Sequence, residues 1–199
     1  MQERSSVSSR KPAARASAAR DTVGYVDVYR PGALAEVRAM IPQASLDVID
    51  NSAAISWLEF EDDHWLMDAT MAVLGREDAV ECWRRSVGNL IERPLLRNFV
   101  EGSLRLFGAK PGKILKMIPK GWTLAYRDFC NPSFELQSET SAEIRFEDVA
   151  PQAFESEGYL HCWHGVCLGV FDLEKPQDGR VEFEIDRAGA CARARFSWR

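Results

Sequence analysis

The stretch Lys120–Arg127, KGWTLAYR, divides the sequence into two parts with different hydrophobic periods. Before it, apolar residues recur mainly at three- and four-residue steps; after Gly121 they alternate with polar ones, beginning with Trp122, Leu124 and Tyr126. The first period is typical of amphipathic helices, and the second of strands with one buried face. The sequence therefore predicts an α+β fold in which an N-terminal helical layer packs on a C-terminal antiparallel sheet.

Four helices are predicted before this point. Their apolar positions have helical spacing over residues 33–41, 63–74, 79–91 and 95–107. The acidic run 61–63 favours the N-terminal end of the second helix, and Gly75 suits its C-terminal end. Residues 23–29 instead alternate, which predicts a short strand. A short amphipathic segment, 114–118, is expected to end at Pro119.

Strands are predicted from Trp122 to the end of the sequence, forming an antiparallel meander. They cover residues 122–126, 142–146, 161–171, 181–185 and 192–198. The last two strands carry acidic residues (Glu182, Glu184) and arginines (Arg193, Arg195) on their polar faces. Opposite charges that face each other across two strands stabilise the pairing by about 0.2–1 kcal/mol each. These two strands are therefore predicted to form a hairpin in that register.

The composition is that of one globular domain, with 199 residues, 46% hydrophobic and 28% charged. Residues 1–22 are rich in Ser, Ala and Arg, so we expect a disordered basic tail there and a single domain over residues 23–199. An electrostatic arm, a transit peptide and a solvated extension remain open for the tail. The chain as a whole has a net charge of −5. This acidity argues against nucleic-acid binding by the folded domain.

Cysteine content and hydrophobic runs indicate the compartment. Five cysteines, none in a C-x-x-C pair, argue against a secreted disulfide framework. No apolar run approaches the roughly 20 residues that a membrane-spanning helix needs. We expect a cytoplasmic protein without a membrane span.

Several local strings together resemble a paralogous family of unknown function from myxobacteria. They are Trp65, the Leu74-Gly75 stop, the run Leu95 to Gly108, Pro119–Trp122 and the closing Ala194–Trp198. That family is similar in fold to the superfamily of haem nitric-oxide-binding domains, 4-vinyl reductase sensor domains and Bet3-like transport subunits. The resemblance covers about residues 23–199. It implies a ligand-binding-like domain, with a buried pocket between helices and sheet and a role in sensing or regulated assembly.

Histidines and cysteines gather in His161–Cys167, HCWHGVC. In a strand, Cys162 and His164 share one face, whereas His161 and Cys167 share the other. The four side chains then cannot close one tetrahedral zinc site, although Cys162 and His164 remain candidates for half of one. We expect a metal-free strand with buried cysteines. The same parity separates His161 from Cys162 and argues against a cysteine nucleophile.

Haem binding and catalysis find little support in the residues. Haem needs an axial ligand such as a proximal histidine, and the single histidine predicted on a helix, His64, is expected at the surface. The tyrosine-serine-arginine pattern of haem-binding relatives is missing from the chain. No nucleophile elbow, phosphate-binding loop or zinc-protease motif occurs either. We therefore expect no haem, no other cofactor and no enzymatic activity.

Aromatic residues on predicted inward faces are the candidate ligand-binding site. They are Trp83, Phe99, Phe107, Trp122 and Tyr126. Such side chains either line a cavity or fill it, and ordinary core packing is the commoner outcome. The leading hypothesis is a noncatalytic sensory or regulatory module that binds a small apolar ligand, a second copy or another protein partner. A structural interaction subunit with a filled core is the alternative, and a cysteine- or metal-dependent enzyme comes third.

Overall fold

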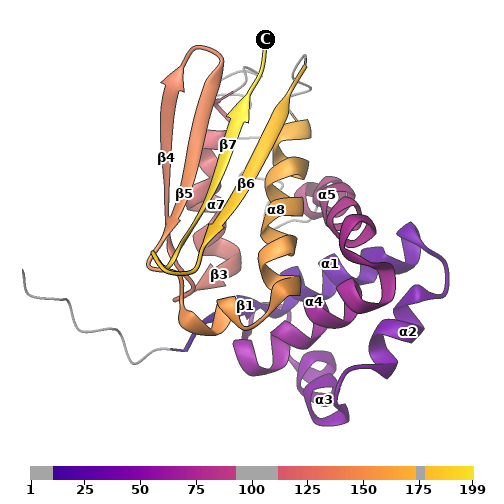
Figure 1. Ribbon diagram of the computed structural model, residues 1–199. Helices are drawn as coiled ribbons and strands as arrows, with labels where there is room; N and C mark the ends of the chain where they lie inside the picture. Colours follow the sequence, from indigo (N-terminus) through magenta and orange to yellow (C-terminus); the bar gives the residue numbers. More distant parts are fainter. Residues whose placement is uncertain (1–10, 93–111, 174–177) are drawn as a thin grey trace, which may run out of the picture.

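The computed structural model describes residues 11–92, 112–173 and 178–199. Figure 1 shows a four-stranded sheet beside a group of helices, most of which precede the sheet in the chain. The predicted α+β class, with the helical layer first and the antiparallel sheet last, is confirmed. None of the helices in these three ranges is long and apolar enough to cross a membrane.

The helical layer begins earlier than the sequence predicted. It consists of α1 (Ala16–Tyr29), α2 (Ala33–Ala39), α3 (Gln43–Asn51), α4 (Phe60–Leu74) and α5 (Arg76–Glu92). The strand predicted over residues 23–29 is wrong, because α1 buries Ala16, Ala19, Val23 and Val26 along one helical face. Residues 13–22 belong to β1 and α1 rather than to a disordered tail; residues 1–10 lie outside the described part of the chain. The predicted helix over residues 95–107 also lies outside it.

A small three-stranded sheet fixes the start of the described chain. It comprises β1 (Ala13–Arg15) in the centre, with β2 (Trp57–Glu59) and β3 (Tyr126–Arg127) on either side, both antiparallel. The Arg15 guanidinium lies over the Trp57 ring, 3.8 Å from its centre. Arg20 donates to three carbonyl oxygens at the end of α3, at 3.1, 3.4 and 2.9 Å. These arginines of the expected basic tail therefore stabilise the helical layer.

The stretch that divides the sequence forms a helix rather than a strand. After a 3-10 turn, η1 (Leu115–Met117), helix α7 (Ile118–Ala125) runs through Pro119 and only Tyr126 reaches a strand. Pro119 lies in the first turn, where the missing N–H breaks no helical hydrogen bond. Trp122 and Tyr126 are four residues apart, a spacing that a helix and an alternating strand share. The alternation seen there was therefore ambiguous.

The C-terminal sheet has the strand order β4-β5-β7-β6. Its strands are β4 (Asn131–Ser138), β5 (Ser141–Glu147), β6 (Arg180–Asp186) and β7 (Cys191–Ser197), all antiparallel. The predicted hairpin register is confirmed, since Glu182 pairs with Arg195 and Glu184 with Arg193. The expected meander is not: β7 rather than β6 neighbours β5, and a helix lies between β5 and β6 in the sequence.

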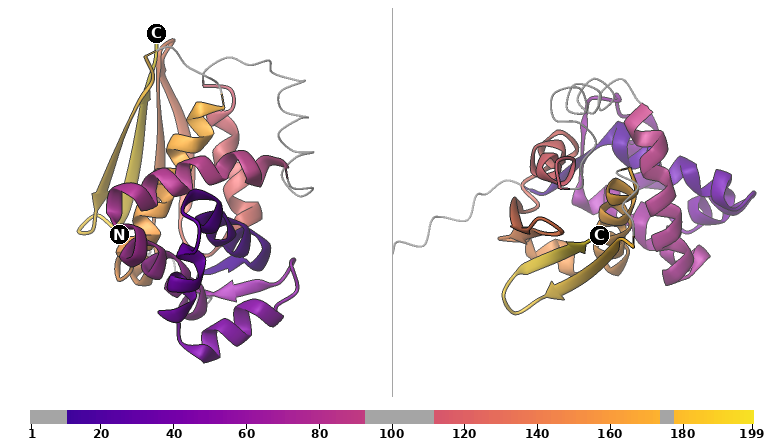
Figure 2. Two further views of the ribbon diagram at one scale, coloured as in Figure 1. Left: turned by 90° about the vertical axis from the view of Figure 1, so that its right-hand side faces the viewer. Right: turned by 90° about the horizontal axis from the view of Figure 1, so that it is seen from above.

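That helix, α8 (Glu157–Asp172), replaces the apolar strand predicted over residues 161–171. It follows the 3-10 turn η2 (Pro151–Phe154) and lies between the sheet and α5 (Figures 1 and 2). Its surroundings explain the error, because a helix buried on several sides loses its polar face. Glycines allow the close approach: an added Cβ would lie 2.7 Å from Trp83 at Gly165 and 2.3 Å from the Arg84 carbonyl at Gly169.

The outer face of the sheet carries a chain of ion pairs. Glu143 on β5 accepts hydrogen bonds from Arg145 and from Arg195, the latter at 3.2 Å. Arg195 also donates to Glu184 at 2.9 Å, and Arg145 to Glu135 at 3.1 Å. Burial by itself would raise the pKa of Glu143, but the two arginines outweigh it and the net pKa is lowered. The Glu143 carboxylate therefore stabilises the pairing of β5 with β7.

Replacing Glu143 with Gln is expected to destabilise the protein by about 1–2 kcal/mol. The change removes a nearly buried carboxylate, so the hydrogen bonds that Arg145 and Arg195 donate to it lose their charged acceptor. A carboxyl with a lowered pKa contributes stability above its ordinary titration range and loses that contribution as the pH falls. The difference between the proteins should therefore shrink on acidification, as measured by urea unfolding. The control is Glu147→Gln, at an exposed position on the same strand; an equal effect of both changes would contradict the prediction.

Candidate functional site

Aromatic rings meet between the helical layer and the sheet in one continuous group, which we call the aromatic cluster. Its members are Phe60, Trp122, Tyr126, Phe129, Phe146, Tyr159 and Trp163. On α8, the Trp163 ring lies 4.9 Å from Trp122 and 5.5 Å from Phe146, centre to centre. One turn earlier, Tyr159 stacks on Phe129 at 5.0 Å. The cluster thus joins α4, α7, α8 and β5.

The structure brings some of the predicted ligand-binding residues together and not others. Trp122 and Tyr126 are neighbours in the cluster, with ring centres 4.3 Å apart. Trp83 is fully buried on α5, where its Cβ faces Gly165 of α8. Phe99 and Phe107 lie outside the described residues. A ligand-binding role for these five aromatic residues remains a prediction.

Sequence reasoning missed the members of the cluster that lie on α8. Tyr159 and Trp163 are four residues apart and share a face of α8. The strand predicted over residues 161–171 contains Trp163 but leaves Tyr159 out. A signal was present in Gly158, Gly165 and Gly169, whose spacings of seven and four residues place them on one side of a helix. That side packs against α4 and α5.

Asp63, in the first turn of α4, is a fully buried acid beside the cluster. Its Oδ2 accepts a hydrogen bond from the Tyr159 hydroxyl, and its Oδ1 has no hydrogen-bond partner in the part of the chain that the structure describes. Burial raises the pKa of Asp63 to about 7; the Tyr159 hydrogen bond opposes this rise and the charge of Asp62 adds to it. Burial also raises the pKa of Tyr159 well above its usual value. The Tyr159 hydroxyl therefore keeps its proton and donates it to Asp63. A buried acid with a perturbed pKa is a candidate functional group.

The cysteines of α8 are buried, as the sequence predicted, but they belong to a helix. Cys162 and His164 point in directions about 200° apart on a helix, so the shared face expected for half of a zinc site is wrong. Burial raises the pKa of Cys162 well above its usual value and that of Cys167 to about 12. Within residues 11–92, 112–173 and 178–199, no group of three or more His, Cys, Asp or Glu side chains could hold a metal ion.

Comparisons with solved structures reveal the relationship of this architecture to known proteins. The H-NOX protein from K. algicida in its Fe(II) unliganded form aligns with a TM-score of 0.65 and 14% identity, over 93% of this chain and 96% of that one. A mutant of the T. tengcongensis H-NOX aligns with a TM-score of 0.60 and 10% identity, over 93% and 97%. The chain has the H-NOX fold. An oxygen-binding H-NOX domain related to soluble guanylate cyclases also matches, at a TM-score of 0.58 and 10% identity over 93% and 95%. No sequence-family model and no curated protein matches the chain.

Structures with this fold include H-NOX proteins studied for haem distortion, so the fit of a haem can be tested against the histidines. The three histidines of the sequence all lie within the described ranges, and none is a member of the aromatic cluster. His64 lies at its margin, stacked on Phe60, with Nδ1 2.8 Å from the Phe60 carbonyl oxygen. His161 Nε2 lies 3.6 Å from a Glu157 oxygen, and His164 stacks on Phe183. None of the three imidazoles belongs to the aromatic cluster, so the described residues offer no histidine ligand for a haem at the cluster itself.

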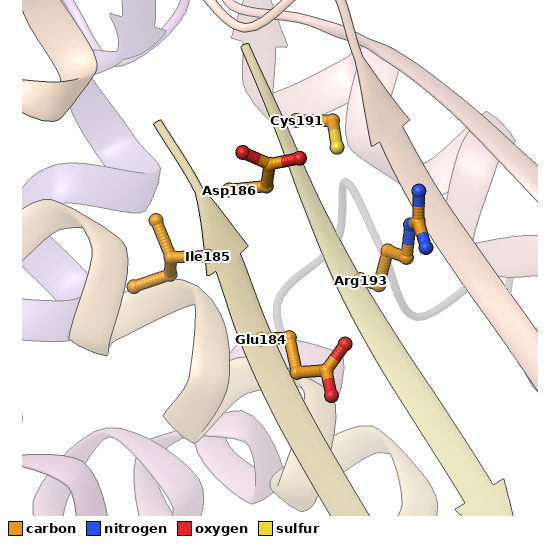
Figure 3. Close-up of a pocket in the computed structure, with 5 residues that line it drawn as sticks. All are labelled: Glu184, Ile185, Asp186, Cys191 and Arg193. Carbon is orange, nitrogen blue, oxygen red and sulfur yellow. The ribbon is translucent and has the colours of Figure 1, made fainter. Parts of the chain in front are cut away.

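A separate pocket of about 290 Å³ lies on the outer face of the β6–β7 hairpin (Figure 3). Figure 3 shows Glu184, Asp186, Cys191 and Arg193 on one side of the two strands, with Ile185 pointing away. Cys191 faces outward among charged side chains, as predicted. Arg193 forms no ion pair or hydrogen bond with any residue that the structure describes, whereas Asp186 accepts the Gly189 N–H at 2.9 Å. This pocket is charged and open, so it does not suit an apolar ligand.

Proposed function

We propose that the chain is a noncatalytic sensory or regulatory module that binds a small apolar molecule at the aromatic cluster, with Trp122 and Tyr126 as contact residues. Trp83, Phe99 and Phe107 complete the proposed set. The observation that carries the proposal is the position of the cluster between the helical layer and the sheet of an H-NOX fold. Aromatic walls with a few polar groups are typical of sites for small organic ligands.

The absence of catalytic activity is part of the same proposal. Burial raises the pKa of Cys82 and Cys167 to about 12, and it also raises the pKa of Cys130 and of Cys162 well above the usual value. Thiols in such surroundings are inert, because the thiolate is the reactive form. All five cysteines are free thiols, which supports a reducing compartment such as the cytoplasm.

A structural interaction subunit is the second candidate, and the packing of the cluster favours it. Ring centres of neighbouring members are 4.3–6.3 Å apart, within the range of aromatic pairs in an ordinary filled core. Such a subunit would act through its surface, with a second copy or another protein as its partner.

Native mass spectrometry of the full chain purified from cells would distinguish these functions. We expect a species heavier than the bare chain by the mass of a small organic molecule, which denaturation releases. The Trp122→Leu variant should lose at least about nine-tenths of this species, because it removes the largest contact surface at the proposed site. Trp65→Leu, at a partly exposed position on α4, should retain it.

Other outcomes would contradict the proposal. A bare oligomer would support the interaction subunit, and chelator-removable mass would support a metal protein. A haem absorption band in the purified protein would overturn the conclusion drawn from the three histidines.

A further inference from the structure

The unpartnered Asp63 oxygen is not explained by the contacts that stabilise the fold. Oδ2 is satisfied by the Tyr159 hydroxyl, but Oδ1 is buried without a hydrogen-bond partner. Leaving a buried acceptor unsatisfied costs about 1–3 kcal/mol, and more for a charged group. A neutral side chain at this position could accept the Tyr159 hydrogen bond without that cost. The second oxygen therefore needs a partner that none of the described residues supplies.

Charged neighbours do not account for Asp63 either. Within the described ranges, the charged side chain that influences its carboxyl is Asp62, and this charge is repulsive. Among the described residues, no lysine or arginine forms an ion pair with Asp63. The carboxyl is therefore neither half of a salt bridge nor part of the ion-pair chain on the sheet.

The surroundings of the carboxyl define the chemistry of the missing partner. The Tyr159 ring that holds Oδ2 contacts Phe60, Phe129 and Tyr126, with ring centres 5.4, 5.0 and 6.3 Å away. The charge of Asp63 also contributes to the raised pKa of Tyr126 and of Cys162. An unsatisfied acceptor among these aromatic rings suits a molecule with an apolar body and a hydrogen-bond donor.

We propose that Asp63 Oδ1 accepts a hydrogen bond from the ligand, so that the ligand is a phenol, an aromatic alcohol or an N–H heterocycle rather than a pure hydrocarbon. This inference rests on the proposed function of the aromatic cluster and deepens it. Trp122 and Tyr126 would contact the apolar body, and Asp63 would orient its polar end. Sites that hydrogen-bond a ligand donor reject analogues that lack it, because the buried acceptor then stays unpaired.

The test compares two probes of similar shape: indole, whose N–H only donates, and indene, which has no donor. Each is titrated into the full chain at about pH 8, above the pKa of about 7 of Asp63, and followed by NMR through the side-chain N–H signals of the tryptophans. We expect indole to bind at least about tenfold more tightly than indene, in the range of one hydrogen bond to a charged group. In Asp63→Asn the preference should disappear while indene affinity is unchanged, because the amide nitrogen presents a donor to the indole N–H where Oδ1 was an acceptor. Asp62→Asn is the matched control and should keep the preference.

The outcomes separate this inference from the function on which it rests. Equal binding of the two probes to the wild-type protein, or a preference that survives in Asp63→Asn, would overturn the role of Asp63 and leave an apolar site in place. An ordered water as the sole partner of Oδ1 would also give equal binding. Failure of both probes to bind would overturn the proposed function and this inference with it. Backbone NMR spectra of each variant establish that it is folded.

Discussion

Replacing Asp63 with Asn should make the protein more stable than the wild type at and above neutral pH, by a margin that grows as the pH rises from about 4 to about 7 and is constant at higher pH. The folded-state pKa of Asp63 is raised to about 7 from an ordinary value of 3.8, mainly by burial. The folded protein therefore binds a proton that the unfolded chain releases, and the wild type loses stability as the pH rises between these two values. Asparagine keeps an oxygen for the Tyr159 hydroxyl and carries no charge at any of these pH values.

Urea unfolding of both proteins at about pH 5 and about pH 8 measures this difference. Since one pKa unit corresponds to about 1.4 kcal/mol, the advantage of the variant should increase by about 3 kcal/mol between the two conditions. The groups that face Asp63 are Asp62, Tyr159, Tyr126 and Cys162, and they are unchanged in the variant. The control is Asp47→Asn, at an exposed position on α3. Its free energy of unfolding should differ from that of the wild type by the same amount at both pH values. A margin independent of pH would show that Asp63 is ionised in the folded protein throughout this range.

Replacing Gly169 with Ala should destabilise the protein by at least about 2 kcal/mol. An added Cβ would lie 2.3 Å from the Arg84 carbonyl oxygen and 2.5 Å from Cγ2 of Val87, so α5 and α8 would have to separate. Overpacking of this kind costs about 1–3 kcal/mol and occasionally more. Because the first obstacle is backbone, we expect the upper part of that range, which exceeds the gain of about 1 kcal/mol in helix propensity.

The chain offers a matched control for this change in Gly88. It also lies in a helix, α5, but an added Cβ there would meet no atom within 4 Å. Gly88→Ala should therefore stabilise the protein by up to about 1 kcal/mol. Thermal and urea unfolding, followed by circular dichroism, measures both variants. If Gly169→Ala were as stable as Gly88→Ala, the close contact between α5 and α8 would not exist in solution.

The strands with one solvent-facing side were predictable because successive side chains point alternately to the core and to solvent. On β5, Ala142, Ile144 and Phe146 face the core while charged residues face outward, and the same pattern marks β7. The hairpin register followed from charge, since the acids of β6 face the arginines of β7. Helices with one apolar stripe, such as α5, were recognised for the corresponding reason.

The elements that were misassigned lack such a contrast. Helix α8 is apolar on most sides because α4, α5 and the sheet surround it, so its sequence reads as a buried strand. Helix α1 was missed because its buried face starts with small residues, Ala16 and Ala19, in a segment whose composition resembles a disordered tail. In α7, the four-residue step from Trp122 to Tyr126 fits both structures.

For the candidate site, the sequence by itself determined which side chains are available. Trp122 and Tyr126 could be named because they follow the change of period. A histidine-ligated haem could be doubted because the single histidine on a predicted helix, His64, was expected at the surface. Only the tertiary structure decided that Asp63 and Tyr159, 96 positions apart, share a hydrogen bond in the interior. Alternation and helical spacing report whether a residue faces water or the core. They carry no information about which distant residue it meets there, because that contact depends on how whole elements pack.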